Sequence, residues 1–230
     1  MARLFLFDID GTLLHCGKQV AKIFAGALRD TFGGHGPLEG FRFAGKTDPM
    51  IVRELTAAVG LAATEIDAGL DKMAELYVER LERELDVGKM QVLPGVLPLL
   101  DSLAGREQVA VGLLTGNWRG GARAKLGRVG LWDYFELGAF GEDAYDRRGL
   151  VPVALARARA LKGYDFRPEE ALIVGDTALD VDCAKASGLP CLAVATGFTP
   201  AEELRAAGAD WVFGDLVEAC RELPFLATSG

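Results

Sequence analysis

Leu4-Phe5-Leu6-Phe7-Asp8-Ile9-Asp10-Gly11-Thr12 is the stretch that decides the fold of this 230-residue chain. It begins with four apolar residues that do not alternate with polar ones. Such a run is typical of a strand buried on both faces, as in a parallel sheet. Two carboxylates follow at once in a turn-forming segment. The stretch therefore predicts a central strand that ends in acidic residues.

Further short apolar runs follow along the chain, at 109–114, 172–174, 191–195 and 211–213. Each is followed by a turn-forming Asp, Gly or Thr, and amphipathic stretches at 151–161 and 180–187 lie between them. Strands that alternate with helices from about residue 95 onward are the pattern of an open α/β sheet. The expected fold is an α/β, Rossmann-like parallel sheet.

Residues 16–90 interrupt this alternation. Apolar residues recur at helical spacing within 20–28, 48–59 and 70–85, and no strand is predicted there. Asp48-Pro49 predicts a helix start, with proline at the first helical position. We expect a core domain formed by residues 1–15 and 91–230, with a small helical domain inserted over 16–90. The chain would return to the core near Pro94-Gly95.

Composition and charge narrow the class of protein. Lys and Arg number 25 against 33 Asp and Glu, a net charge of −8, which argues against binding to nucleic acid or a membrane surface. No apolar stretch approaches the length of a membrane span or a signal-peptide core. The four cysteines form no C-x-x-C pair, so neither a disulfide framework nor a zinc site is predicted. We expect a cytoplasmic protein.

Polar residues follow three of the predicted strands. Asp8 and Asp10 follow the first, Thr115-Gly116-Asn117 the second, and Gly175-Asp176 with Asp180 the third. Because the carboxyl ends of parallel strands share one edge of a sheet, these segments should meet in one crevice. Acidic groups that meet there repel one another unless a cation neutralises them. Oxygen ligands favour a hard ion, and Mg²⁺ is the expected cofactor.

These three motifs resemble the signature motifs of the haloacid dehalogenase-like hydrolase superfamily. Their order, their spacing and the inserted helices resemble its phosphoglycolate phosphatase-like branch, in which the insertion is a helical cap. The resemblance covers nearly the whole chain. Each motif alone could be ordinary turn or helix-cap chemistry, and their joint occurrence argues for function.

The resemblance implies a role for each strand end. Asp8 would be the nucleophile that forms an aspartyl-phosphate, and Asp10 would protonate the leaving alcohol and later activate water. That role requires Asp10 to arrive protonated, which neighbouring carboxylates would favour. Mg²⁺ would be held by Asp8, Asp176 and the backbone carbonyl of Asp10. Asp180 would orient a metal-bound water or a cationic partner.

The phosphoryl group would be held by the second motif, with Thr115, Gly116 and Asn117 as its binding residues. The family expects a lysine between this motif and Asp176, and the sequence has none in 141–152. Arg147 is the candidate replacement, for catalysis and substrate binding, and Arg148 is the alternative. Dehalogenases of the superfamily lack the second aspartate, so Asp10 favours a phosphate ester as substrate.

Two further features have competing interpretations. Residues 40–47 match the phosphate-loop pattern G-x-x-x-x-G-K-[ST] letter for letter, but no buried strand is predicted before them. We interpret them as a cap segment that faces the site, with Lys46 either a substrate-anion contact or a solvated lysine. The helix after Thr115 carries a run of cations that we interpret as a solvated face: Arg119, Arg123, Lys125 and Arg128.

The expected function is Mg²⁺-dependent hydrolysis of a small phosphorylated metabolite, such as phosphoglycolate or a sugar phosphate. Two alternatives stay open. One is a phosphomutase of the same branch, which would exclude water from the aspartyl-phosphate. The other is a catalytically weak relative that acts as a binding module, because the family lysine is missing. A monomer and a homodimer are both compatible with the sequence.

Overall fold

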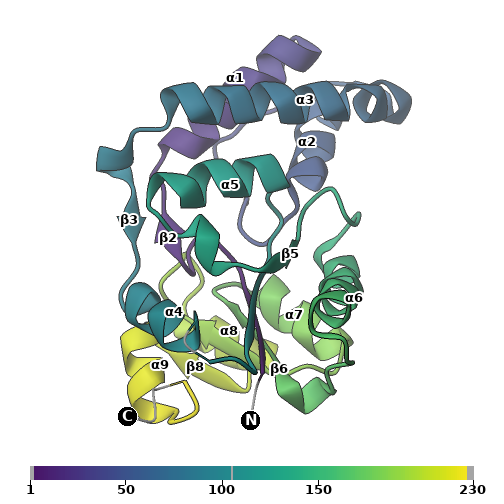
Figure 1. The fold of residues 1–230 in the computed structure, drawn as a ribbon. Coiled ribbons are helices and arrows are strands. Elements are labelled where there is room, and N and C mark those ends of the chain that lie inside the picture. Colours follow the sequence, from purple (N-terminus) through teal and green to yellow (C-terminus); the bar gives the residue numbers. More distant parts are fainter. Residues whose placement is uncertain (1–2, 105, 227–230) are drawn as a thin grey trace.

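A six-stranded parallel sheet forms the centre of the molecule, as predicted (Figure 1). The computed structural model describes residues 3–104 and 106–226. The sheet order is β5-β4-β1-β6-β7-β8, so the strand that carries Asp8 lies between the strands that precede Thr115 and Asp176. The strands are β1 (Leu4–Phe7), β4 (Ala110–Leu114), β5 (Leu137–Ala139), β6 (Ala171–Gly175), β7 (Cys191–Val194) and β8 (Trp211–Phe213).

The inner strands β1, β4, β6 and β7 are buried along their whole length because each face of the sheet has its own apolar core. In β1, Phe5 and Phe7 belong to one core, and Leu4 and Leu6 belong to the other. Successive side chains of a strand point to opposite faces, so a strand between two cores needs an uninterrupted apolar run. This arrangement explains the sequence Leu-Phe-Leu-Phe.

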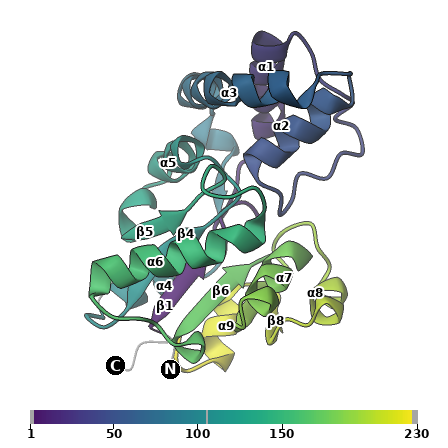
Figure 2. The same ribbon diagram turned by 90° about the vertical axis from the view of Figure 1, so that its right-hand side faces the viewer.

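Helices cover the two faces of the sheet (Figure 2). One core takes its helical residues from α6 (Leu150–Lys162), α7 (Ala178–Ala186) and α8 (Ala201–Ala207). The other takes them from α4 (Val96–Ala104), α5 (Arg119–Arg128) and α9 (Leu216–Glu222), and it continues into the inserted helices described next. Short 3₁₀ turns complete the connections within the described residues: Val87–Lys89, Trp132–Tyr134, Arg147–Gly149 and Pro168–Glu170.

Three helices are inserted between β2 (Leu14–His15) and β3 (Gln91–Val92), which form a short antiparallel pair. These helices are α1 (Gln19–Phe32), α2 (Asp48–Ala57) and α3 (Ala63–Glu84), and we call them the cap. Figure 1 shows the cap beyond the end of the sheet, with α3 against α5. Trp118 stacks on Phe24 of α1 and lies beside Tyr77 of α3, so cap and core share one apolar cluster. The domain limits at residues 15 and 90 stay predictions.

Several short elements differ from the sequence-based expectation, among them the antiparallel pair β2–β3, which was not predicted. Strand β5 was not predicted, because it has three residues and its middle residue is a glycine. The segment near Pro94 was expected only as a return to the core, yet helix α4 begins at Val96 and contains Pro98. Proline is tolerated there because its missing N–H falls in the first helical turn. Among the described residues, no helix is both long and apolar enough to cross a membrane.

Candidate active site

Three neighbouring strands deliver the predicted motifs to one edge of the sheet. Asp8 directly follows β1, Thr115 follows β4 and Asp176 follows β6. Both β4 and β6 pair with β1 in parallel register. The three segments therefore leave the sheet side by side, although Asp8 and Asp176 are far apart in the sequence.

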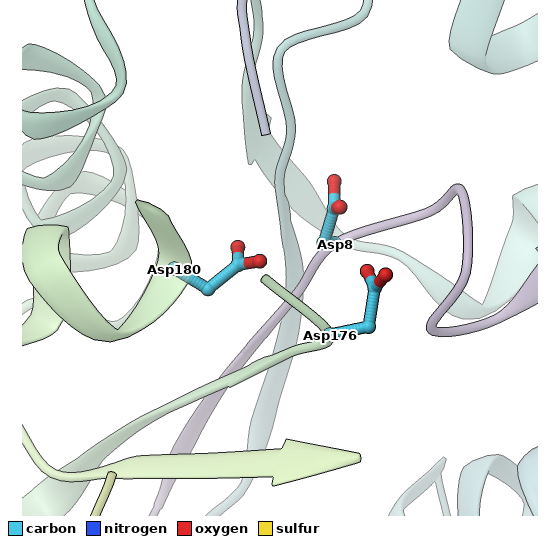
Figure 3. Close-up of side chains that lie close together, drawn as sticks. All are labelled: Asp8, Asp176 and Asp180. Atoms are coloured by element: carbon cyan, nitrogen blue, oxygen red, sulfur yellow. The ribbon is translucent and has the colours of Figure 1, made fainter. Parts of the chain in front are cut away.

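Three carboxylates gather at this edge. Oxygen atoms of Asp8, Asp176 and Asp180 all lie within 4.8 Å of one another, and Figure 3 shows the three side chains side by side. Their exposed fractions are 4%, 2% and 0%. The Thr12 hydroxyl donates to Asp176 Oδ1 at 3.1 Å. Gly11 has a φ of 89°, and a Cβ there would lie 2.4 Å from Asp176 Oδ2, so this turn needs glycine.

Burial makes Asp8 and Asp176 hard to ionise. Desolvation, reinforced by the charge of Asp180, raises the pKa of Asp176 to about 9. Desolvation also raises the pKa of Asp8 to about 6, although Arg147 opposes the shift. Three carboxylates with one adjacent guanidinium leave excess negative charge in a buried place. Such a donor set fits a hard divalent cation.

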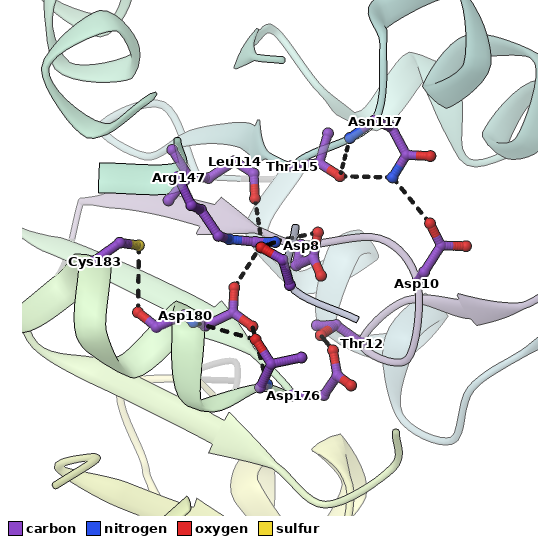
Figure 4. A network of polar contacts seen from close by, with 12 residues as sticks. Asp8, Asp10, Thr12, Leu114, Thr115, Asn117, Arg147, Asp176, Asp180 and Cys183 are labelled. Atoms are coloured by element: carbon purple, nitrogen blue, oxygen red, sulfur yellow. Dashed lines mark hydrogen bonds and ion pairs between the residues drawn. The ribbon is translucent and has the colours of Figure 1, made fainter. Parts of the chain in front are cut away.

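Arg147 is the cation within this cluster. Its side chain is 5% exposed, and its Nη2 lies 2.9 Å from Asp8 Oδ1 and 2.5 Å from Asp180 Oδ1. The same nitrogen donates to the Leu114 carbonyl at 2.9 Å (Figure 4). Arg148 instead is 61% exposed on its side chain and pairs with Asp182 at the surface. The geometry therefore favours Arg147 over Arg148 as the replacement for the family lysine.

Asp180 lies at the start of α7 and supports Arg147. Its Oδ2 accepts from the Thr177 backbone N–H at 2.9 Å and from the Thr177 hydroxyl at 2.6 Å. The Thr177 hydroxyl oxygen accepts in turn from the Asp180 N–H, which completes a reciprocal helix cap. Of the two predicted roles for Asp180, contact with a cationic side chain is the one this geometry fits.

The Asp10 carboxylate points away from this cluster, towards α5. Lys125 Nζ lies 2.9 Å from its Oδ1 and 2.7 Å from its Oδ2, and Asn117 Nδ2 donates to Oδ2 at 2.9 Å. The hydrogen-bond partners of the Asp10 carboxylate are thus a cation and an amide. The neighbouring carboxylates that we expected to favour protonation of Asp10 are not among these partners. The interpretation of Lys125 as part of a solvated face is wrong, because its side chain is 2% exposed.

Thr115 and Asn117 are linked by hydrogen bonds (Figure 4). Asn117 Nδ2 donates to Thr115 Oγ1 at 2.8 Å, and the Asn117 backbone N–H donates to the same oxygen at 3.3 Å. Because the Thr115 oxygen accepts both bonds, its own O–H stays available as a donor. The Asn117 amide donates to both Thr115 and Asp10, so this side chain orients these two residues. The role of Asn117 as a direct substrate contact stays a prediction.

Comparison with known proteins agrees with this geometry. Residues 5–194 match the family model of the haloacid dehalogenase-like hydrolases. The chain belongs to this family. A phosphoglycolate phosphatase of Synechococcus elongatus is 30% identical over 95% of this chain and 97% of its own. A phosphoglycolate phosphatase of Rhodobacter capsulatus is 31% identical over 89% of this chain and 90% of its own. The resemblance inferred from the three motifs is therefore confirmed.

Solved structures of other proteins share the fold. A hydrolase from Pseudomonas syringae superposes with a TM-score of 0.71 at 23% identity and covers 98% of this chain and 100% of its own. A haloacid dehalogenase-like protein from Streptococcus pneumoniae has a TM-score of 0.65 at 19% identity, with 96% and 98% covered. A helical cap inserted near the start of the core is typical of this fold, as expected here.

The cap is hydrogen-bonded to the second motif of this haloacid dehalogenase-like hydrolase. The Asp48 backbone N–H donates to the Gly116 carbonyl at 2.7 Å, and the Trp118 N–H donates to Asp48 Oδ2 at 2.8 Å. Burial raises the pKa of Asp48 to about 7, although nearby Lys125 opposes the shift. A Cβ on Gly116 would lie 2.0 Å from the Lys46 carbonyl oxygen, so the two segments are in close contact.

The segment at 40–47 does not follow a strand. Residues 33–47 are turns and irregular backbone, and Thr47 caps α2 by accepting from the Met50 N–H. The structure therefore lacks the context that a phosphate loop requires. Lys46 Nζ pairs with Glu54 and lies 4.6 Å from the Phe41 ring centroid. Its contact with a substrate anion stays a prediction.

Proposed function

We propose that this phosphatase is Mg²⁺-dependent and hydrolyses a small phosphorylated metabolite through an aspartyl-phosphate on Asp8. The observation that carries the proposal is the environment of Asp8. It lies buried at the end of β1, in contact with Arg147 and beside Asp176. A carboxylate in that place can attack a phosphorus atom while neighbouring groups neutralise the charge that develops.

In the first half-reaction a carboxylate oxygen of Asp8 forms a bond to phosphorus, and the bond from phosphorus to the ester oxygen breaks. Asp10 gives its proton to that oxygen, which leaves as an alcohol. The Thr115 O–H donates to a phosphoryl oxygen, because its oxygen already accepts from Asn117. Arg147 holds the Asp8 carboxylate in place through its bond to Oδ1.

In the second half-reaction a water attacks the aspartyl-phosphate. Asp10, now ionised, takes a proton from that water, and the bond between phosphorus and the Asp8 oxygen breaks to release phosphate. Asp10 is thereby protonated again, and Asp8 is a free carboxylate, so atoms and protons balance over one turnover.

The metal would be held by Asp8 and Asp176, with the Asp10 carbonyl as a further ligand. Asp180 lies in the same cluster, but its oxygens contact Arg147 and Thr177. Bound Mg²⁺ would neutralise the carboxylates and polarise the phosphoryl group. The buried, uncompensated carboxylates support this assignment, since they are the oxygen ligands that a hard cation prefers.

A small substrate fits the position of the cap. Asp48 at the start of α2 is bonded to Gly116 and Trp118, which leaves the cap close above the phosphate-binding segment. A cap in that place favours esters that can be enclosed. Relatives at about 30% identity are named phosphoglycolate phosphatases, so phosphoglycolate is the first candidate and sugar phosphates are the second. All four cysteines are free thiols, which supports a cytoplasmic location; the assembly would be a monomer or a homodimer.

The test is a screen of phosphate esters with Mg²⁺ and with a chelator, on the wild-type protein and on Asp8→Asn. We expect turnover only with the metal, and a loss of more than about a thousandfold in Asp8→Asn because the covalent step is removed. Rapid-quench trapping should show phosphate bound to the wild-type chain only. An Asp8→Asn protein that keeps the wild-type rate would overturn the proposal.

The same screen separates the alternatives. A requirement for a bisphosphate activator, with transfer of the phosphoryl group to a sugar instead of water, would identify a phosphomutase. Binding of esters without turnover of any of them would identify a binding module. Either result would replace the phosphatase proposal.

A further inference from the structure

Lys125 is a buried cation outside the three motifs. It lies on α5, where the other cations, Arg119, Arg123 and Arg128, are exposed. Burial alone would lower the pKa of Lys125, but the adjacent Asp10 carboxylate and the other acidic groups near it, Tyr77, Cys16 and Asp48, together raise it. The side chain is therefore a full positive charge taken out of water. Such a charge is costly unless each of its donors has a partner.

Each donor of Lys125 does have a partner. Its Nζ contacts Asp10 Oδ1 at 2.9 Å, Asp10 Oδ2 at 2.7 Å and Asn117 Oδ1 at 2.7 Å. An ammonium group has three N–H donors and no acceptor, so these contacts use its full capacity. Lys125 thus has no donor left for a substrate, and any effect on the reaction passes through its two partners.

The contact with Lys125 also fixes which way the Asn117 amide points. An ammonium can only donate, so Asn117 must present its oxygen to Lys125. Its Nδ2 then points to Asp10 Oδ2 and to Thr115 Oγ1. Asp10 is consequently held by three bonds, two from Lys125 and one from Asn117. Its side chain is nevertheless 43% exposed, so part of it stays accessible.

We propose that Lys125 is a positioning residue, which acts with Asn117 to hold the Asp10 carboxylate where it meets the leaving-group oxygen and then the attacking water. The inference rests on the proposed function, since it assigns Lys125 to the acid and base steps of that reaction. It adds a residue that lies eight positions beyond Asn117, the last residue of the second motif, and that acts only through Asp10 and Asn117.

A positioning role predicts a dependence on the leaving group. Phosphoglycolate releases an alkoxide that must be protonated as the bond breaks, so this step needs a well-placed Asp10. 2,4-Dinitrophenyl phosphate releases a stable phenolate that needs no proton. The second half-reaction, attack of water, needs Asp10 with either substrate.

The experiment compares the wild-type protein with Lys125→Met, in which a stem of similar length lacks the ammonium. Positioned proton transfer contributes roughly 10²–10⁴-fold, so we expect single-turnover release of glycolate to fall by at least about tenfold. The burst of dinitrophenolate should stay within about threefold of the wild-type burst, followed by a slowed steady state and accumulated aspartyl-phosphate. Lys125→Arg, which keeps the charge, should recover part of the glycolate rate.

Three controls make the result decisive. Arg123→Met removes an exposed cation from the same helix and should leave both rates unchanged. In an Asp10→Asn background, Lys125→Met should have little further effect, because both changes remove the same function, proton transfer by Asp10. If Lys125→Met unfolds below the assay temperature, Lys125→Gln takes its place, because glutamine retains a donor for Asn117. It too should slow the release of glycolate more than the burst of dinitrophenolate.

Equal losses with both substrates, or an undiminished effect of Lys125→Met in Asp10→Asn, would show that Lys125 is merely structural and overturn the inference. A wild-type protein that hydrolyses neither ester would instead refute the proposed function. The two failures are thus distinct.

Discussion

Arg147 sits between two buried carboxylates, and this position decides what its loss should do. Arg147→Ala would leave Asp8 and Asp180 without their guanidinium. Removing one partner of a buried ion pair typically costs about 3–5 kcal/mol, so we expect a lower free energy of unfolding together with a large loss of turnover. Urea denaturation and steady-state kinetics measure the two effects.

Arg148→Ala is the matched control for this change. Arg148 pairs with Asp182 at the surface, and exposed pairs of this kind contribute about 0–1 kcal/mol. Its replacement should leave turnover near wild type. Similar losses in the two variants would mean that Arg147 is not the functional cation. The sequence already made Arg147 the candidate, with Arg148 as the alternative, because Arg147 lies just ahead of the helix predicted over 151–161.

Lys125 shows where prediction from sequence ended. The three motifs were predictable because each follows an apolar run, and parallel strands bring their carboxyl ends together. A lysine between Arg123 and Arg128 gives no such signal, since a run of cations on a helix usually faces water. Its burial depends on the packing of α5 against α3 and on Asp10, which are distant contacts that spacing along the chain does not reveal.

At the scale of elements, the contact between the start of α2 and the second motif depends on a glycine. A Cβ on Gly116 would meet the Lys46 carbonyl oxygen at 2.0 Å and the Thr47 Cα at 2.9 Å. We expect Gly116→Ala to push this cap segment away, which breaks the bond from the Asp48 N–H to the Gly116 carbonyl. Faster hydrogen exchange at the Asp48 amide, with a loss of turnover of about tenfold or more, would report the change.

Gly127→Ala is the control for Gly116→Ala, because it adds the same methyl group where no atom lies within 4 Å. Gly127 is in helix α5, so alanine there should raise the free energy of unfolding by about 0.5–1 kcal/mol and leave exchange at Asp48 unchanged. Unaltered exchange at Asp48 in Gly116→Ala would show that the cap does not depend on this contact.

Helices and strands with a long or uninterrupted apolar pattern were predictable from the sequence, and very short elements were not. The helices of the cap and the strand β1 carry long or uninterrupted apolar patterns, and they lie where the sequence placed them. Strand β5 has only Leu137, Gly138 and Ala139, and it is a strand because β4 pairs with it. A pairing of this kind is a tertiary contact, so three residues could not reveal it.

For the whole molecule, the pH dependence of stability is set less by the net charge of −8 than by the burial of particular acidic residues. Asp8, Asp48 and Asp176 have pKa values raised, mainly by desolvation, to about 6, 7 and 9. In the unfolded chain these carboxyl groups titrate near the ordinary aspartate pKa of about 3.8. Between about pH 4 and pH 9 the metal-free native state therefore binds more protons than the unfolded state. Its free energy of unfolding should fall as the pH rises.

This prediction is checked by urea unfolding between about pH 5 and pH 8, with a chelator or with Mg²⁺. Each raised carboxyl contributes a slope of up to about 1.4 kcal/mol per pH unit below its folded pKa. Because Mg²⁺ would bind the ionised Asp8 and Asp176, its stabilisation should grow with pH and offset the fall. Asp48→Asn, outside the acidic cluster, should reduce the slope and keep the response to Mg²⁺. A metal-free protein that becomes more stable as the pH rises would contradict the prediction, because burial of these acids requires the opposite sign.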